Sequence, residues 1–306
     1  MSLKRLLATG AGAIGVAAVG NHLLTRRAGP LGPPLDGTTD ETDWRGFSVA
    51  TTELGDPEDP DLLAIHGISA AASSHEFADV ASELADDYHV IAPDLLGFGR
   101  SDRPRIGYDP AVYTGVIEAV LAECDEPTVL ASSLSGAYTA AAVADHDIAE
   151  LIAVCPTDRT MAVEMGGPLL RAPIVGRSVY NALVSRPSLR HFYADHGVSD
   201  PDAIDAFRLD YDWQAAHQRG ARWAPAAFLE GALQPDRSLE ALFDPIDAPV
   251  RLLWGADADL PPVDRGRTLA DAIDAELVIF EESALLPHVE RPERVVEVVT
   301  GTEPQD

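Results

Sequence analysis

Ser133 is the side chain in this sequence best placed to act as a nucleophile. It follows the apolar run Thr128–Ala131, which predicts a strand, and precedes Gly136–Tyr138, which opens a helical pattern. A nucleophile on a sharp strand-to-helix turn needs small side chains two positions to either side, and Ala131 and Ser135 meet this need. Ser135 satisfies the same rule as a second candidate, but the strand ends two residues before Ser133. The sequence therefore predicts a serine that attacks ester carbonyl carbons. The alternative is a serine-rich turn without chemistry.

Four segments in order along the chain resemble landmarks of the α/β-hydrolase superfamily, of the esterase and lipase type. They are an apolar strand ending in His-Gly, a loop of the form Asp-x-x-Gly-x-Gly-x-Ser, the turn around Ser133 and a late strand: Leu62–Ile68, Asp94–Asp102, Val129–Gly136 and Val250–Gly255. The similarity extends over about residues 45–300. It implies an α/β-hydrolase fold, with the backbone amides of Ile68 and Leu134 as the oxyanion hole.

The same resemblance shows departures at the two residues that should activate the serine. The segment Ala284–Pro292 resembles a loop that usually reads Gly-His-x-Pro-x-x-Glu-x-Pro, and alignment on its prolines and glutamate places Leu285 at the histidine position. In the superfamily the acid follows three residues after the glycine that closes the penultimate strand, and this position is Ala258. A leucine cannot accept a proton from a serine. The resemblance therefore implies an incomplete or rewired catalytic triad.

Displaced residues are candidates for these two roles. His288 lies three residues beyond the expected histidine, and Asp257 and Asp259 flank Ala258. Three residues of helix rise about 4.5 Å, whereas a general base must come within about 2.6–3.2 Å of the hydroxyl. We name His288 as the candidate base and Asp259 as the candidate acid, with packing as the alternative role of His288. For His66, near the oxyanion loop, holding that loop by hydrogen bonds is the favoured role.

Strand-like and helical patterns alternate along most of the chain, which predicts a mostly parallel sheet with helices on both faces. The strand-like runs are Leu62–His66, Val90–Pro93, Thr128–Ala131, Leu151–Cys155, Val250–Gly255 and Glu276–Phe280. Residues 156–248 carry helical patterning and prolines without a clear strand, at the place where the superfamily inserts a helical cap. We therefore predict a hydrolase core formed by residues 44–155 and 249–301, with a cap insertion at 156–248.

The composition is strongly acidic. The 306 residues carry a net charge of −28, and Lys4 is the only lysine. This balance argues against nucleic-acid binding, which needs a basic surface. Because the acids are spread along the chain and not collected in a tail, they are typical of a halophilic protein kept soluble by a charged surface. Cys124 and Cys155 form no disulfide framework or metal motif, and no motif implies a cofactor.

Residues 1–27 form a hydrophobic segment between two basic pairs. Lys4-Arg5 and Arg26-Arg27 enclose Leu6–Leu24, which is rich in Ala, Gly, Leu and Val. A helix needs about 20 apolar residues to span a bilayer, and this segment reaches that length only by including two polar residues. It fits an uncleaved membrane anchor, a cleaved signal peptide or a helix packed on the domain. We favour the anchor, followed by an acidic Pro/Gly linker at 28–43. This predicts a membrane-associated protein, with a cytoplasmic protein as the alternative.

Two functions fit these residues. The first is a serine hydrolase of weak or unconventional activity on small apolar or ester substrates. The second is a non-catalytic relative that keeps the pocket and binds an apolar small molecule or a protein partner. Loss of any triad member leaves about 10³–10⁴-fold catalysis over water, from the oxyanion hole and substrate binding. We therefore favour the weak hydrolase.

Overall fold

The computed structural model describes residues 3–160, 163 and 165–302, with side chains from residue 15 onward. A single eight-stranded sheet has the order β1-β2-β4-β3-β5-β6-β7-β8. Its strands are β1 (Thr38–Trp44), β2 (Phe47–Leu54), β3 (Asp61–Ile65), β4 (His89–Pro93), β5 (Thr128–Ser132), β6 (Glu150–Val154), β7 (Val250–Gly255) and β8 (Glu276–Phe280). β2 runs antiparallel to both β1 and β4, and all other neighbours are parallel.

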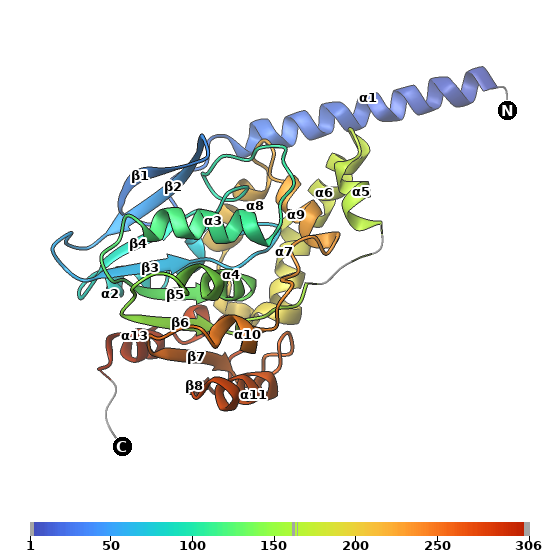
Figure 1. Ribbon diagram of the computed structural model, residues 1–306. Helices are drawn as coiled ribbons and strands as arrows, with labels where there is room; N and C mark the ends of the chain where they lie inside the picture. The colour runs from blue at the N-terminus through green and yellow to red at the C-terminus, as the bar shows by residue number, and fades with distance from the viewer. Residues whose placement is uncertain (1–2, 161–162, 164, 303–306) are drawn as a thin grey trace.

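Helices flank this sheet and fill the long connection between β6 and β7 (Figure 1). The α-helices are α1 (Leu3–Ala28), α2 (Ala81–Leu84), α3 (Pro110–Leu121), α4 (Leu134–Val143), α5 (Gly166–Arg171), α6 (Val175–Leu183), α7 (Arg186–Phe192), α8 (Ala206–Ala216), α9 (Trp223–Leu229), α10 (Leu239–Phe243), α11 (Val263–Ile273), α12 (Pro287–Glu290) and α13 (Pro292–Thr300). Short turns are η1 (Ser74–Phe77), η2 (Tyr193–Gly197) and η3 (Pro201–Ala203). The architecture is the predicted α/β-hydrolase fold.

The central strands are buried on both faces, which explains why their sequences read as continuous apolar runs. In β3, Leu63 and Ile65 pack into the core that includes α3 and α4. Leu62 and Ala64 point to the opposite face and pack with residues of α2 and α13. Successive side chains of a strand alternate between faces, so the short strand β3 packs against the helices on both faces of the sheet.

The linker predicted at residues 28–43 is shorter than expected. Residues 38–43 belong to β1, which pairs along its whole length with β2, and Leu35 is buried in the core. This strand is not predicted from the sequence, because it lies at the edge of the sheet. Four of its first five side chains are exposed and polar, so its composition resembles a solvated linker.

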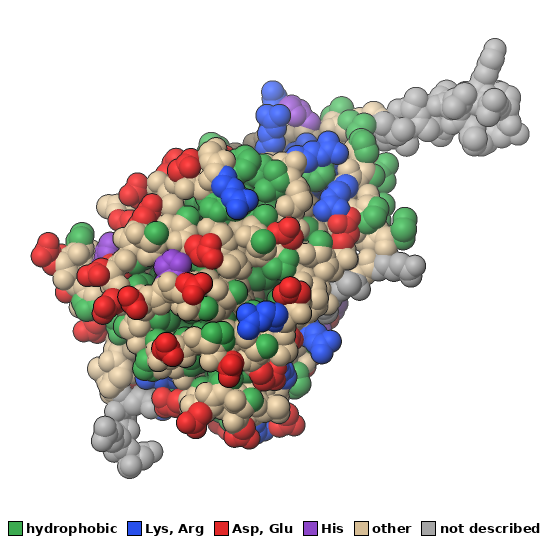
Figure 2. Space-filling view, in the orientation of Figure 1, with side chains coloured by type: hydrophobic (Ala, Val, Ile, Leu, Met, Phe, Trp, Pro, Cys, Tyr) green, Lys and Arg blue, Asp and Glu red, His purple; other side chains and the backbone are tan. Residues whose placement is uncertain are grey.

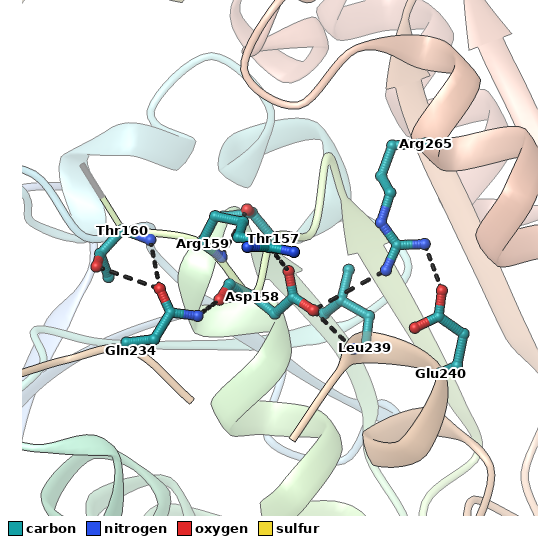
Figure 3. A network of polar contacts seen from close by, with 8 residues as sticks. All are labelled: Thr157, Asp158, Arg159, Thr160, Gln234, Leu239, Glu240 and Arg265. Atoms are coloured by element: carbon teal, nitrogen blue, oxygen red, sulfur yellow. Dashed lines mark hydrogen bonds and ion pairs between the residues drawn. The ribbon is translucent and has the colours of Figure 1, made fainter. Parts of the chain in front are cut away.

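The helical insertion lies at one end of the sheet, in yellow and orange in Figure 1. Among the described residues between β6 and β7 there is no strand, and this helical insertion is called the cap below. A polar network ties the two ends of this insertion together (Figure 3). Asp158 accepts a hydrogen bond from the Leu239 N–H at 3.1 Å, and the Gln234 side chain bonds both Thr160 N and the Asp158 carbonyl. Arg265 of α11 joins the network through Glu240. The cap is therefore fixed to the core at its base.

The C-terminal part of α1 packs on the cap. The Asn21 amide donates to the Ile174 carbonyl and to Ser178 Oγ, each at 3.1 Å, and its oxygen accepts from Asn181 at 2.8 Å. Ala28 is buried in the apolar cluster of the cap. No helix in the described part of the chain is long and apolar enough to cross a membrane. The packing of residues 21–28 agrees with the alternative of a helix docked on the domain, and not with the anchor that the sequence favours.

Candidate active site

Ser133 occupies a strained turn between β5 and α4, as predicted. Its backbone has φ 54° and ψ −129°, in the left-handed half of conformational space that only a constrained non-glycine residue adopts. The Ser133 N–H donates to the Val154 carbonyl of the neighbouring strand at 2.8 Å, which helps to hold the turn in place. Ser135, the second candidate, is fully buried, and its hydroxyl donates to the His66 carbonyl at 2.7 Å. This geometry favours Ser133 over Ser135.

The His-Gly loop lies directly against this turn. A Cβ on Gly67 would stand 3.3 Å from Ser133 Cβ and 3.4 Å from both Ser132 Oγ and Glu76 Oε2, so a side chain here would crowd the turn. The next residue, Ile68, makes no hydrogen bond through its N–H among the described residues. Leu134 is the first residue of α4, where helix N–H groups have no partner within the helix. Neither predicted oxyanion donor is therefore expected to have an acceptor among the described residues.

His66 holds the loop, as the sequence analysis favoured. Its Nδ1 lies 2.7 Å from the Gly67 carbonyl, and its Nε2 accepts a hydrogen bond from the Leu95 N–H at 2.9 Å. The ring is fully buried, with Phe98 against it. Both ring nitrogens are engaged, so this histidine has no free nitrogen with which to activate Ser133.

A small cavity of about 80 Å³ lies between the turn and the cap. The core contributes Ser132, Ser133, Glu76 and the Gly67–Ser73 loop, and the cap contributes Phe192, Tyr193, Arg208 and Asp212. Leu285 and Leu286 complete the wall. Ligand sites for drug-sized molecules have about 300–1,000 Å³. This cavity therefore suits a small acyl group.

The expected histidine and acid positions are both apolar, and they pack together. Ala258 is only 6% exposed and clusters with Cys155 and Trp254. Leu285 packs against this cluster and also lines the cavity beside Ser133. In this protein an apolar contact thus occupies the place where the superfamily's acid–histidine pair is expected.

His288, the predicted base, lies behind the cavity wall and does not line the cavity. It is fully buried and its ring stacks obliquely on Phe77. Its Nε2 lies 3.3 Å from Glu76 Oε1, and the other oxygen of Glu76 accepts a hydrogen bond from the Gly67 N–H at 2.9 Å. His288 is therefore paired with a carboxylate of the oxyanion loop region.

Asp259, the predicted acid, lies outside the cavity. Its carboxylate is 3.5 Å from His196 Nδ1, and its side chain is 59% exposed. The neighbouring Asp257 accepts a hydrogen bond from Ser199 Oγ at 2.9 Å. The structure therefore does not bring His288 and Asp259 together.

Glu76 places a negative charge in the cavity. Burial by itself raises the pKa of the Glu76 carboxyl. Contact with His288 and a hydrogen bond from Ser132 outweigh this effect and lower the pKa to about 2. The group is therefore ionised at neutral pH, next to the loop that carries the Ile68 amide. A fixed negative charge opposes the build-up of an oxyanion nearby. The charge of Glu76 thus disfavours ester hydrolysis through an oxyanion, whereas its hydrogen bond with the Gly67 N–H orders the loop.

Asp212 is a second carboxyl of the cavity that the sequence analysis missed. Burial raises its pKa to about 6, and Tyr193 donates a hydrogen bond to Oδ2 at 2.6 Å. Arg208, another cavity residue, is anchored by the His75 carbonyl and by Asp79. The sequence offered no signal for Asp212, because one more aspartate on a helix is unremarkable among 50 acidic residues.

Known proteins that resemble this chain agree with this fold. The sequence profile of the alpha/beta hydrolase family matches residues 62–298, so the chain belongs to that family. It is 28% identical over 273 residues to an uncharacterised protein of Mycobacterium tuberculosis, covering 78% of this chain and 74% of that protein. It is also 28% identical over 234 residues to a pimeloyl-[acyl-carrier protein] methyl ester esterase of Chromobacterium violaceum, covering 74% and 88%.

A solved membrane phospholipase A has the same fold. Its structure superposes with a TM-score of 0.68 at 23% identity, and the match covers 98% of this chain and 95% of that chain. At this identity the likeness concerns the fold alone.

Proposed function

We propose that this protein is a serine hydrolase of low catalytic power that acts on small esters through Ser133. The observation that carries the proposal is the left-handed backbone of Ser133, which faces a cavity beneath the cap. Such strain costs about 1–3 kcal/mol and clusters at active sites. The N–H groups of Ile68, which lines the cavity, and of Leu134, which follows Ser133 in the chain, add to this support, because we infer that both donate to a developing oxyanion.

Asp212 is the group that we assign as proton acceptor in place of the missing histidine. Its pKa of about 6 suits a general base near neutral pH, and it lines the same cavity as Ser133. The Ser133 proton passes to the Asp212 carboxylate as Oγ attacks the ester carbon. The proton then returns to the departing alkoxide, and water hydrolyses the acyl-serine by the same route. Tyr193 orients Asp212 through its hydrogen bond.

The rate of hydrolysis of p-nitrophenyl acetate should therefore rise with pH through about 6 and then level off, because only the ionised carboxylate accepts a proton. We expect Asp212→Asn to lower the rate by about 10²-fold or more and to abolish this rise. Tyr193→Phe removes a hydrogen bond that lowers the Asp212 pKa, so it should shift the midpoint to higher pH. Steady-state rates between pH 4.5 and 9 provide the measurement.

Two control variants separate this assignment from the pair predicted from the sequence. Asp259→Asn alters a carboxylate outside the cavity and should leave the rate and its pH profile unchanged. Ser133→Ala should reduce hydrolysis to the background of the buffer. A normal rate in Asp212→Asn, together with a loss in His288→Ala or Asp259→Asn, would return the base and acid roles to those residues.

A non-catalytic binding protein is the second candidate. The packing of Leu285 against the Ala258 cluster and the ionised Glu76 beside the oxyanion loop favour it. In that case Ser133→Ala would not change the hydrolysis rate at any pH. The cavity would then serve to bind a small apolar molecule.

A further inference from the structure

A second, larger cavity lies on the side of the cap that faces α1. Its volume is about 580 Å³, and its walls share no residue with the cavity at Ser133. The walls come from the loop after β4, from α6 and from the segment that joins α8 to α9. Five arginines line it: Arg103, Arg105, Arg177, Arg219 and Arg222.

These arginines stand out against the charge of the chain. Acidic residues number 50 and basic residues 22, yet residues 165–194 and 213–229 contain no Asp or Glu. Figure 2 shows blue side chains gathered on the upper part of this face, beside α1, whereas red ones cover its left and lower parts. Asp102 is the only acidic residue of the lining, and its carboxylate already accepts a hydrogen bond from the Ser48 N–H.

Within the described chain, none of the five arginines forms an ion pair with a carboxylate. Arg177 donates to the Thr25 hydroxyl, and Arg222 donates to the Ala172 carbonyl at 3.3 Å. The Nε and Nη2 atoms of Arg103 are buried without a hydrogen-bond partner. A buried guanidinium without a partner is costly, and clustered like charges repel. Burial and the neighbouring Arg177 and Arg105 accordingly lower the pKa of Arg222.

Aromatic surface accompanies these charges. The guanidinium groups of Arg105 and Arg222 lie over the ring of Trp223, at 4.9 and 4.3 Å from its centroid. Phe47 and Tyr180 also line the cavity. The volume falls in the range of organic ligand sites, so the cavity has room for more than a single inorganic ion.

We propose that this cavity binds an organic anion bearing phosphate groups. Guanidinium forks match phosphate oxygens bidentately, and several of them suit a multiply charged group. The organic part of the ligand would lie against Trp223 and Phe47. Either a soluble phosphorylated metabolite or the headgroup of an anionic lipid offers this chemistry. The proposal is independent of any activity at Ser133.

Calorimetric titration of the full chain with inorganic pyrophosphate, at ionic strength fixed with potassium chloride, tests the site. We expect saturable binding, weakened about 100-fold or more in the double variant Arg219→Gln/Arg222→Gln, because each of the two charge-assisted contacts is worth about tenfold or more. Arg171→Gln is the matched control, since Arg171 lies outside the cavity and pairs with Glu230. It should bind as the unchanged protein does. Arg105→Gln serves as a second, exposed variant if the double variant does not fold.

Sedimentation with vesicles identifies the source of the phosphate. Binding to phosphatidylglycerol but not phosphatidylcholine vesicles, competed by pyrophosphate, indicates a lipid headgroup. Pyrophosphate binding without vesicle binding indicates a soluble compound. Absence of binding to both probes would overturn the proposal, as would binding that the arginine variants leave unchanged. If chloride competed with pyrophosphate equally well at matched ionic strength, the site would bind simple anions without preference. This result would also overturn the proposal.

Discussion

Replacing Leu285 by histidine and Ala258 by aspartate should raise the rate of ester hydrolysis by about 10²–10⁴-fold, the usual contribution of a general base. Leu285 lines the cavity beside Ser133 and packs on the cluster that holds Ala258, so the two new side chains would be neighbours. The aspartate would orient the imidazole, and the imidazole would accept the Ser133 proton. Initial rates with p-nitrophenyl acetate measure the gain.

The single variants act as controls for this gain. Leu285→His alone should give part of the increase, and Ala258→Asp alone should give none, because Ala258 does not line the Ser133 cavity and a carboxylate there acts only by orienting the new imidazole. Adding Ser133→Ala to the double variant should remove the increase. A double variant that folds normally but hydrolyses the ester no faster would show that Leu285 does not occupy the position of the missing base.

Glu76→Gln should destabilise the protein by about 3 kcal/mol at neutral pH, because it removes a carboxylate whose charged form is stabilised in the folded state by His288 and Ser132. The pKa of Glu76 is lowered in the folded state, from 4.5 to about 2. Its contribution to stability is therefore fully present above about pH 4.5 and is lost as the pH falls towards 2. The free energy of unfolding of the unchanged protein should fall over this range more steeply than that of Glu76→Gln. Urea titrations at pH 7 and at pH 3 give both values.

Glu83→Gln is the matched control, because Glu83 is an exposed residue of the neighbouring helix α2. It should change the unfolding free energy by less than about 0.5 kcal/mol. A similarly small change in Glu76→Gln would show that the pair with His288 does not contribute to the fold.

The sequence predicts the parallel strands of the sheet well and misses β1 and β2, which pair antiparallel at one end of it. Six apolar runs predict strands, and all six are strands, because a parallel strand covered on both faces must be apolar throughout. β1 and β2 both escape prediction. β1 is an edge strand with mostly exposed, polar side chains, and β2 buries Thr51 and Thr52 where a continuous apolar run would have been recognised. The small residues around Ser133 predict its turn, because a sharp strand-to-helix turn has room only for small side chains at these positions.

The residues around Ser133 are predictable only in part. Leu285 and Ala258 are identified because they replace residues that the superfamily pattern expects. Glu76 and Asp212 are not, because their roles depend on burial and on partners far away in sequence. Glu76 and His288 lie far apart in sequence, although their side chains come within 3.3 Å of each other. No local sequence pattern can therefore identify this pair.

The rate at which a fluorophosphonate probe labels Ser133 tests the account most directly. Intact-mass spectrometry of the full chain should show slow, single-site labelling that rises with pH through about 6, is absent in Ser133→Ala and is retained in His288→Ala. Labelling in Leu285→His/Ala258→Asp should be fast. Fast, stoichiometric labelling of the unchanged protein that is lost in His288→Ala would contradict the account, because it would show that a histidine already activates this serine.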